Sequence, residues 1–167
     1  MLRTIGLAAV VILSGCGPKV PSEEQKRKDA ADVAAVEAIQ KVAPPIKPIA
    51  LQSITLAEIE AKNLSGAGCS FFTTTPAEPL VLALVGRALI KTDDHIDMLT
   101  SDNGGTKLEA GAWEHYLGKE HTLTLKRVPG AGKPSGAESA RYAGELIVRD
   151  AWDRVVYSVQ GSLDCGA

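Results

Sequence analysis

Hydrophobic and polar residues alternate with a period of two over much of the C-terminal two thirds of the chain. In residues 121–128, Leu123 and Leu125 fall on one face, opposite threonine and lysine side chains. The last two segments of this kind have apolar positions at Tyr142, Leu146 and Val148 and then at Val155, Tyr157, Val159 and Leu163. This alternation predicts β-strands that each bury one face.

A different pattern occurs at residues 80–85, which form a continuous apolar run between Pro79 and Gly86. Such a short run, bounded by residues that interrupt regular structure, predicts a buried strand.

Residues that form turns separate the predicted strands. Asp93-Asp94 lies between residues 88–92 and 95–100 and predicts a hairpin, and residues 102–105 read Asp-Asn-Gly-Gly, which tolerates positive φ. Short strands broken by regular turns predict a mainly β fold for residues 49–167, either an antiparallel β-sandwich or a small barrel.

Helical patterns precede the predicted strands. Residues 23–42 contain neither glycine nor proline, and Ser22 can cap a helix of about 20 residues, whose thin apolar stripe suits a stalk or loose packing. Residues 43–48 are rich in proline and predict a stiff, extended linker. Residues 55–64 predict one short helix, with Thr55 as its cap and Glu58 at the third position.

Composition narrows the function classes. The 167 residues are 45% hydrophobic and 23% charged, with a formal net charge of −2. These values exclude a collagen-like, disordered or multi-span membrane protein, and the charge gives no support for a nucleic-acid partner.

The amino terminus has the layout of a secretory signal, with Arg3 followed by an apolar run that is too short to cross a bilayer. The run ends in Leu13-Ser14-Gly15-Cys16, which resembles the lipobox of bacterial lipoprotein signal peptides. The resemblance implies that residues 1–15 are removed and that Cys16 carries the lipid; the alternative is a conventional signal followed by a buried or paired cysteine. Gly17, where enterobacterial inner-membrane lipoproteins have Asp, implies the outer membrane.

These features define the expected domain organisation: a signal peptide at 1–15, a lipidated N-terminus with a helical tether and linker at 16–48, and the β domain at 49–167. Lipidation of Cys16 leaves Cys69 and Cys165 as free thiols. In an oxidising compartment such a pair favours a disulfide over the alternative, a reactive Cys69.

Candidate catalytic and metal-binding residues are few. Asp93, Asp94, His95 and Asp97 form one cluster, and a third metal ligand would have to come from His115 or His121 through the fold. The favoured interpretation is a solvated acidic turn, so we expect neither a metal nor a cofactor.

Two further features admit a functional reading. The loop at residues 130–136 resembles a phosphate-binding loop only superficially, because Pro134 follows Lys133 where that motif needs Ser or Thr. Trp152 lies between two aspartates in a predicted turn. It is either an exposed binding residue or, as favoured here, a residue packed back on the sheet.

Two functions remain from different classes. The first is a lipoprotein anchored in the outer membrane, facing the periplasm, with a non-catalytic β domain that binds a protein or cell-wall partner. The second is an envelope hydrolase or metal-dependent enzyme with a site near Asp93–Asp97.

Overall fold

The computed structural model describes residues 21–73 and 78–167. The chain divides into two compact units, Met1–Ala43 and Pro44–Ala167, which are taken separately below. The second unit begins five residues before the boundary expected at residue 49. The predicted signal peptide and Cys16 lie outside the described residues, so lipidation stays a prediction.

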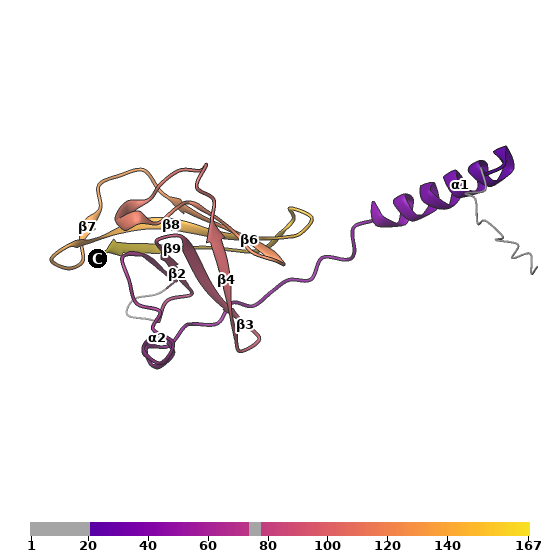
Figure 1. Ribbon diagram of the computed structural model, residues 1–167. Coiled ribbons are helices and arrows are strands. Elements are labelled where there is room, and N and C mark those ends of the chain that lie inside the picture. Colours follow the sequence, from indigo (N-terminus) through magenta and orange to yellow (C-terminus); the bar gives the residue numbers. More distant parts are fainter. Residues whose placement is uncertain (1–20, 74–77) are drawn as a thin grey trace, which may run out of the picture. The chain divides into compact units, whose positions relative to one another are not determined.

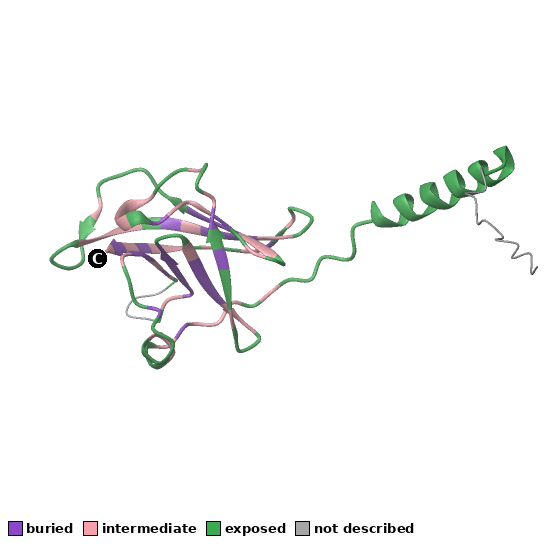
Figure 2. Ribbon diagram, in the orientation of Figure 1, coloured by how far each residue is buried: buried purple, intermediate pink, exposed green. Residues whose placement is uncertain are grey.

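The first unit contains helix α1 (Glu23–Gln40). The Ser22 hydroxyl accepts the N–H of Gln25, which confirms the predicted cap, and the Gln25 side chain donates to Asp29. None of the α1 side chains is buried (Figure 2). Within the part of the chain that the structure describes, the helices lack the length and apolar character needed to cross a bilayer.

The second unit is a closed antiparallel barrel, which decides between the two predicted β architectures (Figure 1). Within residues 44–73 and 78–167, eight strands pair in the order β6-β5-β4-β3-β2-β1-β9-β8, and pairing of β6 with β8 closes the ring. The strands are β1 (Gly68–Phe72), β2 (Val81–Leu84), β3 (Arg87–Thr92), β4 (His95–Ser101), β5 (His115–Leu117), β6 (His121–Arg127), β8 (Ser139–Asp150) and β9 (Val155–Gly166). The short strand β7 (Lys133–Pro134) lies within the loop predicted at residues 130–136 and pairs with β8.

Side chains fill the barrel interior. Inward positions on successive strands carry large apolar residues with no exposed surface: Phe71, Ile90, Tyr116, Leu123, Leu125, Leu146 and Leu163. A barrel of eight strands is just wide enough for side chains to fill. The Tyr116 hydroxyl accepts the N–H of Trp113 at 2.8 Å, and burial raises the pKa of this phenol. The interior is therefore a packed core.

A second, smaller core lies outside the barrel wall. Helix α2 (Leu56–Ala61) and its flanking residues bring Ile54 and Leu64 against the outward leucines of β2 and β3: Leu82, Leu84 and Leu89. Val81 and Ala83 point inward on β2. The predicted buried strand is thus confirmed for Val81–Leu84, which is buried on both faces, whereas Val85 lies beyond the strand and is exposed.

A β-bulge corrects the predicted register of β9. Val148 pairs with Tyr157 and Arg149 pairs with Val155, so Val156 is an extra residue on β9. An extra residue reverses which face the preceding side chains occupy. Val156 is accordingly buried and Val155 is 45% exposed. The prediction that Val155 shares the inward face with Tyr157 is wrong for this reason.

The disulfide lies where the first and last strands of the barrel meet. Cys69 on β1 and Cys165 on β9 are register partners, with Cα atoms 4.0 Å apart and their sulfurs at bonding distance. Both cysteines are buried. The predicted pairing therefore spans the β1–β9 junction, 96 residues apart in sequence.

Replacing both Cys69 and Cys165 with Ser is expected to lower the free energy of unfolding by roughly 4 to 5 kcal/mol, because a closed loop of about a hundred residues restricts the unfolded chain. Urea denaturation of the oxidised parent and the double variant measures the difference. Non-reducing electrophoresis should show the parent migrating faster than its reduced form. Equal mobility, with both thiols open to alkylation, would contradict the disulfide.

An ion pair fixes α2 to the barrel. The Glu58 carboxylate accepts the backbone N–H and the hydroxyl of Thr55, each at 2.9 Å, which completes the predicted cap. Lys91 on β3 donates to the other Glu58 oxygen at 2.7 Å. The hydrogen bond from Lys91, with those from Thr55, lowers the pKa of Glu58 from 4.5 to about 2.

This pKa shift predicts a defined pH dependence. A carboxyl group with a depressed folded-state pKa stabilises the fold above its unfolded pKa, and that stabilisation is lost as the pH falls from about 4.5 to about 2. Glu58→Gln should therefore lose less unfolding free energy than the parent between pH 5 and pH 2.5, as measured by urea denaturation. Glu60→Gln, on the exposed side of α2, should behave like the parent; an equal loss in all three proteins would refute the argument.

Candidate functional site

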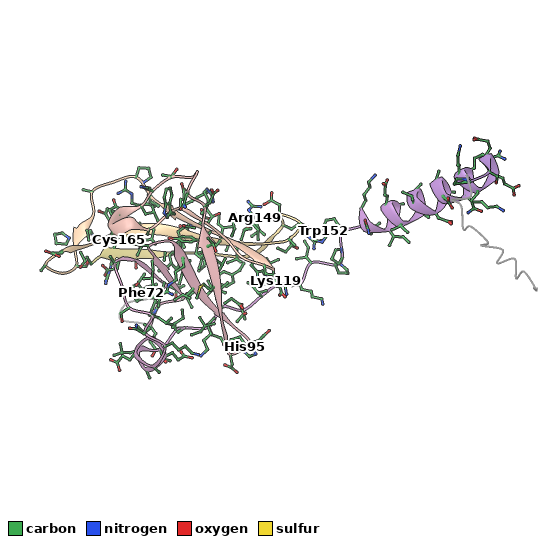
Figure 3. The ribbon with its side chains drawn as sticks, in the orientation of Figure 1. Phe72, His95, Lys119, Arg149, Trp152 and Cys165 are labelled. Atoms are coloured by element: carbon green, nitrogen blue, oxygen red, sulfur yellow. A yellow bond between two sulfur atoms is a disulfide. The ribbon has the colours of Figure 1, made fainter. Side chains whose placement is uncertain are left out.

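An open cleft of about 740 Å³ lies at one end of the barrel. Its walls come from the β3–β4 turn, the β5–β6 turn, the β8–β9 turn and the linker at residues 44–50. Lys119 and Trp152 from two of these turns lie at this end, and Cys165 lies toward the other (Figure 3). We call this hollow the Trp152 cleft.

The β8–β9 turn is held by one carboxylate. Asp150 Oδ1 accepts the backbone N–H groups of Trp152 at 2.9 Å and Arg154 at 3.0 Å. Its Oδ2 accepts a hydrogen bond from Nε of Arg154 at 2.9 Å. This hydrogen bond from the guanidinium holds the pKa of Asp150 below its usual range. Charge-assisted hydrogen bonds of this kind are stronger than neutral ones. Asp150 therefore braces the turn at Trp152 and Arg154 together.

The same turn presents Trp152 to solvent. Asp153 adopts a positive φ of 58°, and its carbonyl accepts a hydrogen bond from Arg149 at 2.8 Å. Trp152 is 42% exposed and belongs to neither hydrophobic core. The favoured prediction that Trp152 packs back on the sheet is wrong, because Asp150 fixes the backbone in a reversal that projects this side chain outward. Trp113, by contrast, is half-buried and packs against the barrel core.

The linker forms the other wall of the cleft. Nη1 of Arg154 donates to the carbonyl of Pro44 at 2.6 Å. The N–H of Ile49 donates to the carbonyl of Val156, the bulge residue of β9, at 3.4 Å. Arg154 thus contacts the turn and the linker at once.

The rim of the cleft carries both signs of charge. Lys47, Lys119, Asp93 and Glu120 line it and are all exposed. In the described part of the chain, the ion pairs do not include these four side chains, whereas Asp150 and Arg154 pair with each other. The rim therefore offers a ligand both positively charged hydrogen-bond donors and negatively charged hydrogen-bond acceptors.

The predicted acidic cluster at residues 93–97 is a hairpin turn. Asp93 and Asp94 have φ values of 45° and 63°, the left-handed conformations of a tight turn between β3 and β4. His95 and Asp97 follow on β4 and are exposed. The Asp97 carboxylate accepts the Thr92 hydroxyl at 2.8 Å.

The remaining histidines do not complete a site with this turn. His115 pairs with Thr124 across β5 and β6, with its Nδ1 3.1 Å from the threonine hydroxyl. His121 lies at the start of β6, opposite Gly118, so the two histidines do not face each other. Across residues 21–73 and 78–167, no group of three or more His, Cys, Asp or Glu side chains is placed to hold a metal ion.

Comparisons of this chain with protein-family models, with curated proteins and with solved structures found no match.

One feature of the sequence could have indicated this site, namely the residues on either side of Trp152. Asp150 and Arg154 flank Trp152 four residues apart, a spacing that lets one carboxylate bind both the turn backbone and the guanidinium. The contact between Arg154 and Pro44 joins residues 110 positions apart, which no local pattern predicts.

Arg154→Ala is expected to release the linker, because it removes the only side chain that the structure shows donating to the Pro44 carbonyl among the described residues. Amide hydrogen exchange at Ile49 should become faster, while exchange in the barrel core stays slow. Arg141→Ala, which removes an ion pair with Asp164 near the disulfide, serves as the matched control. Unchanged exchange at Ile49 in the Arg154 variant would show that the linker is held by other contacts.

Proposed function

We propose that this protein is a bacterial envelope lipoprotein, anchored in the outer membrane through Cys16 and facing the periplasm. Its barrel is a non-catalytic module that binds a protein or cell-wall partner at the Trp152 cleft. The observation that carries the binding role is an exposed tryptophan on a turn that Asp150 and Arg154 hold rigid. A rigid, exposed aromatic residue gives binding energy at a low cost in conformational entropy.

The packing of the barrel supports binding on its surface. Large apolar side chains occupy the inward positions of the strands, so the core has the character of a structural interior. The Trp152 cleft is open, and its volume lies in the range of ordinary ligand sites.

The chemistry of the cleft supports a non-catalytic role. Asp150 and Arg154 are committed to each other and to the turn backbone, and His95 and Asp97 belong to an exposed hairpin. Cys69 is paired with Cys165, which removes it as a candidate nucleophile. The alternative enzyme near Asp93–Asp97 gains no support from these contacts.

The proposed location rests on the sequence and fits the disulfide. Buried disulfides persist in oxidising compartments such as the periplasm. Helix α1 has 18 residues, a length of about 27 Å, and its exposed surface suits a spacer between an anchor and a folded domain.

Cys16→Ser is expected to abolish incorporation of radioactive palmitate in a bacterial host and to move the protein from the membrane to the soluble envelope fraction. Removing the modified thiol removes the acyl chains that hold the protein at the bilayer. Cys69→Ser, assayed alongside, should remain labelled, since it leaves the proposed anchor intact. Persistent labelling of the Cys16 variant would contradict the anchor.

A further inference from the structure

We propose that the Trp152 cleft binds the glycan of the bacterial cell wall, a polymer of N-acetylated amino sugars that carry short peptides. This inference rests on the proposed envelope function and names the partner of the same site. It commits to the cell wall in place of a protein partner.

The first argument is the aromatic surface. A pyranose ring has an apolar face of C–H groups and a periphery of hydroxyl groups, so it can pack on a flat indole while its edges stay hydrated. Trp152 offers such a surface, with 42% of the residue exposed. Because Asp150 fixes the backbone N–H groups of Trp152 and Arg154, little backbone freedom is lost when a ligand packs there.

The second argument is the chemistry of the rim. The exposed ammonium groups of Lys47 and Lys119 can donate to acetamide carbonyls and to peptide carboxylates. The carboxylates of Asp93 and Glu120 can accept hydrogen bonds from sugar hydroxyls and from peptide amines. A cell-wall strand carries groups of both signs, and the rim matches it with side chains of both signs. A strongly anionic polysaccharide would instead favour a uniformly basic surface.

The third argument is the shape of the site, which favours a glycan over a protein. Stable protein interfaces are broad and centre on a desolvated apolar core. The Trp152 cleft is instead a hollow of about 740 Å³, whose lining combines one exposed indole, the apolar linker residues Pro44, Pro45, Pro48 and Ile49, and the exposed charged side chains of the rim.

Co-sedimentation with purified peptidoglycan sacculi tests the proposal, using the full-length protein in detergent. The parent should pellet with sacculi, and Trp152→Ala should weaken binding at least tenfold. Trp152→Phe, which keeps a ring, should retain part of the affinity, and a Lys119→Ala, Glu120→Ala double variant should weaken binding several-fold. Val85→Ala, an exposed apolar residue away from the cleft, is the matched control and should bind like the parent. Thermal unfolding establishes that each variant is folded.

Competition identifies the part of the polymer that is bound. A soluble oligosaccharide of N-acetylglucosamine, which lacks peptides, should displace the parent from sacculi at sufficient concentration. Equal pelleting of the parent and Trp152→Ala would overturn the proposal, as would a parent that does not pellet.

A second measurement separates this inference from the proposed function. A photo-crosslinking residue at position 152 that captures an envelope protein, in a parent that ignores sacculi, would refute the glycan and leave the lipoprotein binding role standing. Failure of the proposed lipid anchor would appear independently, as palmitate labelling that survives Cys16→Ser.

Discussion

The pairing of β1 with β9 is the constraint on which the rest of the barrel depends. Five register pairs join these strands, from Gly68–Gly166 to Phe72–Ser162, and they bring together segments almost a hundred residues apart. This pairing leaves neither β1 nor β9 with an open edge that would expose unpaired backbone groups. It also brings β9 round to the position where its bulge meets the linker. Cys69 and Cys165 make this distant pairing covalent.

The sequence predicted the elements better than their arrangement. Period-two alternation and the Asp93-Asp94 turn predicted strands that the structure contains, and Thr55 with Glu58 predicted the start of α2. A sandwich and a barrel require the same alternation, so only the pairing of β6 with β8 distinguished them. Val155 was assigned to the wrong face because a bulge depends on the partner strand and leaves no mark in the alternation itself.

The candidate site was harder to predict because its parts are distant in the chain. The sequence singles out Trp152, but the exposure of its side chain depends on the geometry of the turn. That geometry is determined by backbone hydrogen bonds to Asp150. The linker was predicted to be stiff and extended, yet its place as a wall of the cleft follows from one guanidinium that reaches Pro44. The Asp93–Asp97 cluster was predictable because it is local: Asp93 and Asp94 adopt the positive φ values of the favoured, solvated turn between β3 and β4.

The attachment of Pro44 to Arg154 also has a mechanical consequence. Any tension along the chain from the N-terminal side arrives at Pro44 and Ile49 before it arrives at a barrel strand, and both are bonded to the β8–β9 turn or to the bulge beside it. The antiparallel ladder of β9 with β8 then spreads that load over many hydrogen bonds. The β8–β9 turn that bears Trp152 is thus the first part of the barrel to which tension in the N-terminal chain is transmitted.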